Sequence, residues 1–241
     1  GIICEEFKHE DLDETSLYSH ELELSESFWN KQQKITYDNS TDVTSFQLKG
    51  TELTKMHPGT FLKIQRGDKS LKLRIIEKNS PQIATVQYIK PKTVLGLTPQ
   101  SIEQEYAVDL LLDETLEVVN ITGKAGTGKT MLALAVGISQ VLKGVYEKVL
   151  ITREIVPLGN DIGYLPGSEF KKLIAWHQGI MDNLKELSSI YLKQGKGELS
   201  YKDFEKTIEI IDSSTARGRS IHRHYIIYDE SWRQGLDGIG R

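Results

Sequence analysis

The chain has 241 residues, of which 38% are hydrophobic and 27% are charged, and its formal net charge is −4. This composition is typical of a soluble globular protein. This small negative net charge excludes an electrostatic field of the whole molecule that would attract nucleic acid. Any nucleic-acid-binding site must therefore be a local basic patch. The single cysteine, Cys4, excludes an intrachain disulfide and a zinc site made of several cysteines.

The sequence contains no run of about 18 apolar residues, which argues against a membrane span. The first residues, GIICEEFKHEDLDE, lack the basic and then apolar pattern of a secretion signal. Together with the single cysteine, these features predict a cytoplasmic protein. The chain begins with Gly rather than Met, so we expect a processed or partial chain.

The N-terminal part of the sequence predicts two regions. Residues 1–40 are acidic and mixed, and we expect a connector with a short helix over residues 25–33. Residues 41–95 predict a small antiparallel β subdomain with a hairpin turn at Gly67-Asp68, because apolar and polar residues alternate in four segments. These segments are TSFQLKG, TFLKIQR, LKLRIIE and QIATVQYIK. Its position in the chain suggests a role in nucleic-acid binding.

Residues 96–241 alternate between helical and strand patterns, which predicts an α/β core with a parallel sheet. The first expected helix starts with Thr98 as N-cap and Pro99 as the first helical residue, and Ser101 to Gln104 has the spacing of a capping box. The next helices are expected to start at Lys129 and after a cap at Ser168. The expected strands are TLEVVNIT (115–122), EKVLITR (147–153), KTIEII (206–211) and HYIIYD (224–229).

The segment GKAGTGKT (123–130) fits the phosphate-binding pattern G-x-x-x-x-G-K-[ST] and lies between an expected strand and an expected helix. Its glycines allow successive backbone N–H groups to point into one hollow, which the positive end of the helix also faces. Lys129 is expected to reach the β- and γ-phosphates, and the Thr130 hydroxyl to ligate Mg²⁺. We therefore expect a P-loop NTPase core that uses ATP and Mg²⁺. The nucleotide-binding residues are Gly123, Lys124, Ala125, Gly126, Thr127, Gly128, Lys129, Thr130 and Met131.

The segment YIIYDE (225–230) predicts the second part of the same site. A buried strand that ends at Asp229 would place this carboxylate beside the phosphate loop, where it can hold Mg²⁺. Glu230 follows directly and can polarise a water molecule in line with the γ-phosphate. This pair favours hydrolysis over transfer of the phosphoryl group to a bound acceptor.

Three further residues are candidates with an open alternative. Gln104 can donate to and accept from the adenine edge, or it can simply cap its helix. The basic segment TARGRSIHRHY (215–225) contains Arg217 and Arg219. These arginines can contact a γ-phosphate in the same or a neighbouring subunit, or a nucleic-acid backbone, or they belong to a solvated loop.

Five segments in this order resemble the PhoH family of ATPases: VNITGKAGTGKTMLALAVGISQVL, KVLITREIVPLGNDIGYLPGSEFKKLIAW, IMDNLKEL, TARGRSI and YIIYDE. IEQEYAVDLLLDE resembles the entry segment of PhoH proteins that carry an N-terminal PIN ribonuclease domain. The resemblance implies an ATPase core related to superfamily 1 helicases, often assembled as a ring and acting on RNA. It supports residues 123–130 as the phosphate loop, Gln104 as the adenine reader, and Asp229 and Glu230 as the metal and water residues. It also draws attention to Arg153, Arg217 and Arg219.

The sequence departs from the family pattern in two places. The family has Pro after the arginine at 153, where this chain has Glu154, and Ala-Gln-Asn after Asp-Glu, where this chain has Ser231-Trp232-Arg233. The family then continues through another helix and strand. Only eleven residues follow Glu230, and a parallel sheet needs neighbours on both sides of its inner strands. We therefore expect a sheet that is incomplete at its C-terminal side and a native chain longer than 241 residues.

The leading functional hypothesis is an ATP-hydrolysing module that unwinds or remodels RNA. Its expected partners are ATP, single-stranded RNA, further copies of itself in an oligomer such as a ring, and a PIN domain upstream. The alternative is a nucleotide-dependent regulatory or oligomerisation domain with little motor activity. A small-molecule kinase is disfavoured by Glu230 and by the lack of an arginine-rich lid.

Overall fold

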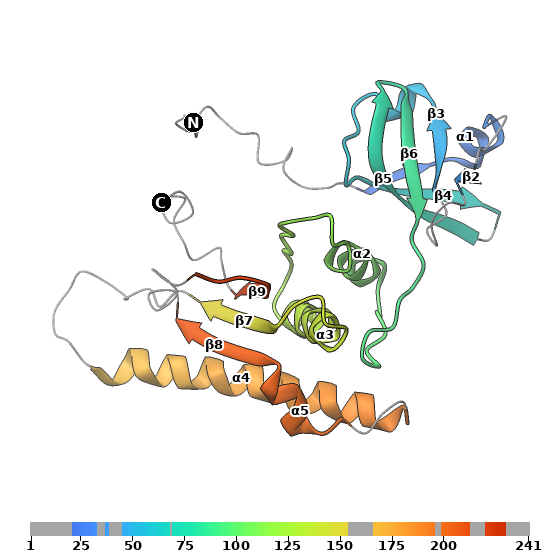
Figure 1. The fold of residues 1–241 in the computed structure, drawn as a ribbon. Coiled ribbons are helices and arrows are strands. Elements are labelled where there is room, and N and C mark those ends of the chain that lie inside the picture. The colour runs from blue at the N-terminus through green and yellow to red at the C-terminus, as the bar shows by residue number, and fades with distance from the viewer. Residues whose placement is uncertain are drawn as a thin grey trace, which may run out of the picture. The chain divides into compact units, whose positions relative to one another are not determined.

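The computed structural model describes residues 21–32, 37–38, 45–67, 69–153, 166–195, 199–212 and 220–229, with the backbone alone for 37–38, 166–175 and 212. The chain forms two compact units that divide between Lys90 and Pro91 (Figure 1). The sequence pattern predicts a boundary at 95/96, five residues further along the chain. No helix within the described ranges is long and apolar enough to cross a membrane.

The first unit is a six-stranded sheet with the order β1-β4-β5-β6-β3-β2. Its strands are β1 (Glu21–Leu24), β2 (Tyr37–Asp38), β3 (Ser45–Lys49), β4 (Phe61–Arg66), β5 (Lys69–Ser80) and β6 (Ile83–Tyr88), and its helices are α1 (Glu26–Asn30) and the 3₁₀ turn η2 (Thr51–Leu53). The four alternating segments are strands, so the predicted β subdomain is confirmed. The sheet is mixed rather than purely antiparallel, because β1 pairs with β4 in parallel.

Period-2 alternation explains the core of this unit. Leu62 and Ile64 of β4 and Leu73 and Ile75 of β5 are fully buried on one side of the sheet. Arg66 pairs with Lys69, so the β4–β5 connection is a two-residue hairpin turn. Gly67 opens this turn with φ of +54°, a conformation that hairpin turns of this length favour.

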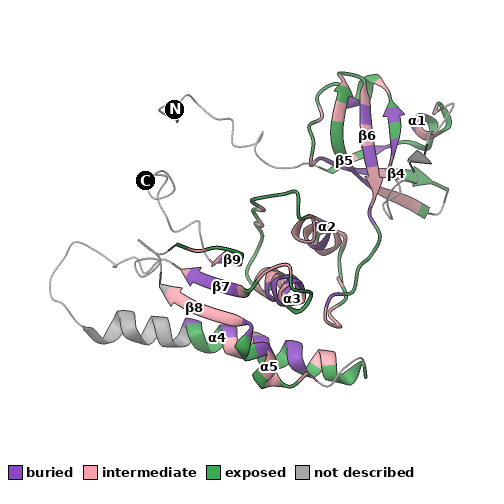
Figure 2. Cartoon of the chain, viewed as in Figure 1, coloured by how far each residue is buried: buried purple, intermediate pink, exposed green. Residues whose placement is uncertain are grey.

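The second unit contains a parallel sheet with the order β8-β7-β9, which confirms the predicted parallel α/β core. Its strands are β7 (Lys148–Arg153), β8 (Ile208–Asp212) and β9 (His224–Asp229), and its helices are α2 (Ile102–Leu111), α3 (Lys129–Leu142), α4 (Pro166–Lys193) and α5 (Tyr201–Lys206). The central strand β7 is largely buried, whereas β8 is intermediate (Figure 2). Residues from α3, α4 and α5 share one core with the strands.

The close approach of α3 to the sheet depends on Gly137. A Cβ atom at this position would lie 2.7 Å from a ring carbon of Tyr225 on β9 and 3.1 Å from a methyl group of Val149 on β7. Real Cβ atoms do not approach other atoms so closely, so a side chain at 137 would push the helix away from both strands. This glycine therefore helps to fix the distance between the sheet and the helix that follows the phosphate loop.

The predicted strand at 115–122 is wrong. This segment has no regular secondary structure, and Val118 and Leu116 are 86% and 39% exposed. The physical reason is the lack of a partner, since a strand needs a neighbour that satisfies its backbone groups. Both edges of β7 are already paired, by β8 and β9, and residues 115–122 do not pair with the outer edge of either of those two strands.

The predicted cap at Ser101 is confirmed, whereas those at Thr98 and Ser168 are wrong. The cap of α2 is Ser101, whose hydroxyl accepts a bond from the Gln104 N–H at 3.3 Å, whereas the Thr98 hydroxyl bonds Thr93. Helix α4 begins at Pro166, so Ser168 lies inside it. Proline favours the first turn of a helix because its missing N–H would have no partner there.

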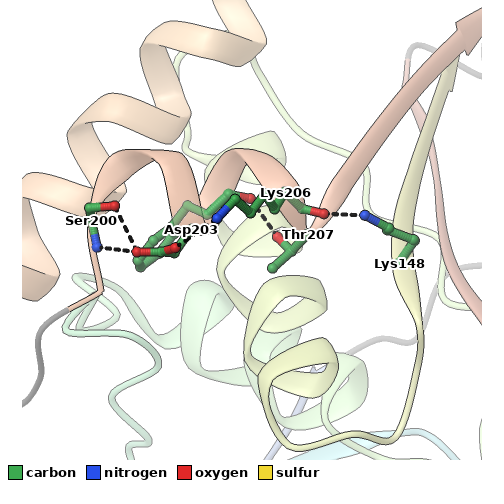
Figure 3. A network of polar contacts seen from close by, with 6 residues as sticks. Lys148, Ser200, Asp203, Lys206 and Thr207 are labelled. Carbon is green, nitrogen blue, oxygen red and sulfur yellow. Dashed lines mark hydrogen bonds and ion pairs between the residues drawn. The ribbon is translucent and has the colours of Figure 1, made fainter.

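The short helix α5, which we did not predict, leads directly into β8. Its start is a capping box in which the Asp203 carboxylate accepts bonds from the Ser200 hydroxyl and N–H at 2.7 and 2.9 Å (Figure 3). These bonds hold the pKa of Asp203 below its ordinary value. At the other end, the Lys148 ammonium of β7 donates to the Lys206 carbonyl, which ties the helix to the sheet.

Candidate nucleotide-binding site

The phosphate loop is curled rather than extended. Gly123, Gly126 and Gly128 have φ angles of +155°, +78° and +82°, and Gly128 is the N-cap of α3. Residues with a side chain rarely adopt these angles, so the three glycines are the positions that the curl requires. The loop leads into the N-terminus of a 14-residue helix, where backbone N–H groups and the helix dipole favour an anion.

The Lys129 side chain lies against its own loop. Its ammonium donates to the carbonyl oxygens of Gly123 and Lys124, each at 2.8 Å. The Thr127 hydroxyl donates to the same Lys124 carbonyl at 2.9 Å. The positive charge is thus held at the loop, within reach of an anion that the N–H groups would bind. A phosphate there would exchange neutral carbonyl partners of the ammonium for a charged one, which is the stronger interaction.

The structure brings Thr130 and Asp229 together, although they are far apart in the sequence. The Thr130 hydroxyl lies 3.4 Å from one carboxylate oxygen of Asp229. The other oxygen accepts a hydrogen bond from the Trp176 indole N–H at 2.9 Å. Asp229 is the last residue of β9 and is paired in register with Arg153 of β7, so the sheet fixes its place beside the start of α3.

These oxygens fit a magnesium ion. Mg²⁺ prefers hard oxygen ligands and is usually held by one or two protein groups together with substrate phosphates and water. A hydroxyl and a carboxylate that face each other at the end of the phosphate loop provide such a pair. The described part of the chain contains no group of three or more His, Cys, Asp or Glu residues that could form an all-protein metal site.

Gln104 lies against the phosphate loop. Its amide nitrogen donates to the Thr127 carbonyl at 3.0 Å, and its amide oxygen accepts from the Gln100 N–H at 2.6 Å. A Cβ atom on Gly128 would be 3.4 Å from the amide nitrogen. The side chain therefore joins the start of α2 to the loop in this structure. Adenine recognition by Gln104 stays a prediction, and it would require these bonds to be exchanged.

Three predicted residues, Glu230, Arg217 and Arg219, lie outside the described residues. Arg153 is described, and its guanidinium carbon lies 6.0 Å from the centre of the Trp176 ring. Trp176 itself was not among the predicted site residues. The only sequence signal was a tryptophan in an amphipathic helix, which usually marks a core position, and nothing in the pattern indicated a contact with Asp229.

A parallel sheet, a curled glycine-rich loop that opens a helix, and an aspartate at a neighbouring strand end define a P-loop NTPase. A family model described as "PhoH-like protein" matches residues 96–234, more than half of the chain. The chain therefore belongs to the PhoH-like protein family. Family membership supports a nucleotide-binding domain with a general NTPase role.

Several curated relatives agree with this assignment. Protein PhoH2 of Bacillus subtilis is 33% identical over 96% of this chain, which spans 51% of that relative. Protein PhoH2 of Mycolicibacterium smegmatis is 39% identical over 58% of this chain and 31% of its own length. A PhoH-like protein of Mycobacterium leprae is 28% identical over 55% of this chain and 36% of its own length. The chain thus spans about half or less of these relatives.

Proposed function

We propose that this chain is the ATP-binding and ATP-hydrolysing module of a PhoH-like protein, and that hydrolysis drives the unwinding or remodelling of RNA. The observation that carries the ATPase proposal is the approach of Asp229 to Thr130 at the end of the phosphate loop. This contact unites two sequence motifs that were predicted separately, and each supplies one oxygen to the place where Mg²⁺ acts in P-loop enzymes.

In this proposal the loop and the adjoining residues bind and orient the triphosphate. The N–H groups of the loop and the N-terminus of α3 hold the phosphate oxygens. Lys129 moves from its loop carbonyls to the β- and γ-phosphates. Thr130 and Asp229 would hold Mg²⁺, which would supply positive charge to neutralise the phosphate oxygens. Gln104 is the candidate for the adenine edge.

Hydrolysis requires a water molecule in line with the γ-phosphate. We assign the orientation of this water to Glu230, which follows Asp229 in the sequence. As the water oxygen bonds to the γ-phosphorus, the bond to the β-phosphate oxygen breaks, and ADP and phosphate are released. The water proton passes to the Glu230 carboxylate and from there to the released phosphate or to solvent. Arg217 and Arg219 are candidates to stabilise the γ-phosphate charge, in the same subunit or in a neighbour.

The RNA part of the proposal rests on charge as well as on the family resemblance. Residues 45–90 contain nine Lys or Arg and three Asp or Glu, although the whole chain is acidic. This is a local basic region of the kind that a nucleic-acid backbone requires. Trp29 in the same unit has the Arg66 guanidinium over its ring, 5.2 Å from the centre. We propose that this first unit contacts single-stranded RNA.

Two further features of the whole protein are proposed on the family resemblance: a homo-oligomer such as a ring, and a PIN ribonuclease domain upstream. A cytoplasmic location is proposed from the single cysteine, which fits a reducing compartment. The greater length of the curated relatives leaves room for the additional domain.

The test is the rate of ATP hydrolysis by the chain with and without single-stranded RNA, compared with that of Glu230→Gln. We expect RNA to stimulate the wild type. The variant should bind ATP and lose turnover by about a hundredfold or more, as removal of a base-like group does. Near-normal turnover in Glu230→Gln would remove its assignment. ATP binding without turnover in the wild type would favour the regulatory alternative, and turnover without RNA stimulation would remove the RNA proposal.

A further inference from the structure

Trp176 and Thr130 contact different oxygens of the Asp229 carboxylate. The indole N–H donates to one oxygen at 2.9 Å, while the other oxygen faces the Thr130 hydroxyl at 3.4 Å. The two oxygens are thus divided between different partners. One is occupied by a neutral donor of the protein, and the other faces the side of the phosphate loop.

The Trp176 ring is itself held in place by its surroundings. It is 9% exposed and belongs to the core that α3 and α4 share with the sheet. The Arg153 guanidinium lies 6.0 Å from the ring centre, a distance at which a cation is attracted to an aromatic face. A ring packed in this way cannot turn freely, so its N–H points in a fixed direction.

We propose that Trp176 is a positioning residue for the magnesium-binding carboxylate. By donating to one oxygen, the indole fixes the rotation of the Asp229 side chain and leaves the other oxygen directed at Thr130. This inference rests on the proposed ATPase function, because it assigns a role within that same site.

The chemistry of the indole suits this role. An indole has one donor and no acceptor, and it is neutral. It therefore orients the carboxylate and leaves its negative charge for the cation. A lysine or arginine in the same position would compete with the metal for that charge. Removing a group that hydrogen-bonds to a metal ligand typically lowers metal affinity or activity by about 10- to 100-fold.

The first test is Trp176→Phe, which keeps an aromatic ring and removes the N–H. Two quantities are measured: the Mg²⁺ concentration that half-saturates ATP turnover, and the affinity for Mn²⁺, used as a probe metal, in the presence of ADP. We expect both to weaken by about 10- to 100-fold, with metal-free ATP binding and the melting temperature close to those of the wild type. Tyr191→Phe, which removes a polar hydrogen from another aromatic ring of α4, is the matched control and should change neither quantity.

Two results would overturn the inference. One is an unchanged metal dependence in a folded Trp176→Phe. The other is an equal loss of metal-free ATP binding and metal affinity, which would indicate general damage to the site. Failure of the wild-type chain to bind ATP would instead contradict the proposed function, so the two failures are distinguishable.

A second test keeps Trp176 in place and remains decisive if Trp176→Phe does not fold. The chain has three tryptophans, so replacing Trp29 and Trp232 by Phe leaves Trp176 as the only one. Addition of Mg²⁺ to the ADP complex should change its fluorescence emission, and Asp229→Asn should abolish this change. Emission that is insensitive to Mg²⁺, or a response that persists in Asp229→Asn, would contradict the proposed contact.

Discussion

The two units of this chain obtain their sheets in different ways. In the first unit, β4, β5 and β6 follow one another through short turns and pair as antiparallel neighbours. In the second unit, β7 pairs with β8 and β9, which lie more than fifty residues further along the chain. Strand-forming sequence is sufficient where the partner is the next segment. Where the partner is distant, the same kind of sequence becomes a strand only if that partner is in place.

The difference between the two sheets also explains why the candidate nucleotide site lies in the second unit. In the first unit the alternation places apolar residues on a buried side of the sheet, and the partly exposed Lys63 and Lys72 lie between them on neighbouring strands. This arrangement can provide a surface. In the second unit the parallel strands run in one direction, so Arg153 and Asp229 end side by side. The phosphate loop reaches the same end through the contact between Thr130 and Asp229. The parallel sheet therefore brings polar groups from distant segments of the chain together in one site.

Among substitutions that leave the chain folded, the largest effect is expected in the core of the first unit. Leu62→Ala removes a fully buried side chain and should lower the free energy of unfolding by about 2–5 kcal/mol. Ile76→Ala, at a position that is 38% exposed in the same sheet, should cost less. Chemical denaturation measures both, and ATP binding should be unchanged in each. Loss of ATP binding in Leu62→Ala would show that the units are not independent.

A smaller effect is expected from a glycine in the second unit. Gly137→Ala places a methyl group against Tyr225 and Val149 and should destabilise the chain by about 1–3 kcal/mol through overpacking. The control is Gly179→Ala in α4, where no atom lies within 4 Å of the added Cβ. That change should stabilise the chain by up to about 1 kcal/mol, since alanine favours a helix. Equal effects of the two substitutions on the denaturation midpoint would contradict the close packing of α3 on the sheet.

The smallest effect is expected where the strand prediction was wrong. Val118 is 86% exposed, so Val118→Asp should change the free energy of unfolding by less than about 0.5 kcal/mol in this chain. Val149→Asp, at a fully buried position of β7, is the contrasting variant and should prevent stable folding. A large cost for Val118→Asp would mean that residues 115–122 are buried as a strand after all.

Most of the fold follows from the sequence because its signals are local. The alternation over 45–88, the apolar strands that became β7 and β9, and the glycine pattern of the phosphate loop each depend on a few adjacent residues. The parallel pairing of β1 with β4 could not be predicted in this way, because β1 is four residues long and its partner lies beyond α1. The unpaired state of 115–122 depends likewise on strands elsewhere in the chain.

The candidate site could likewise be predicted only where its residues belong to local sequence motifs. Lys129, Thr130 and Asp229 belong to motifs whose spacing carries the chemistry, and the structure brings the last two together. The contact between Trp176 and Asp229 joins residues 53 positions apart. It arises from the packing of α4 into the core that it shares with α3 and the strands, and a single sequence contains no pattern for such packing. The two hydrogen bonds of the Gln104 amide, to Gln100 and to Thr127, could not be predicted for the same reason. They depend on where α2 meets the phosphate loop.

The central claim is that residues 123–130 form a nucleotide-phosphate site, and equilibrium binding of ATP tests it most directly. Titration of the chain with ATP, followed by calorimetry, should show one site, and Lys129→Ala should weaken it by about 10- to 100-fold, the loss expected for a charge-assisted bond. Lys143→Ala, at the opposite end of α3, should bind ATP like the wild type. Absence of ATP binding, or equal affinity in wild type and Lys129→Ala, would contradict the account.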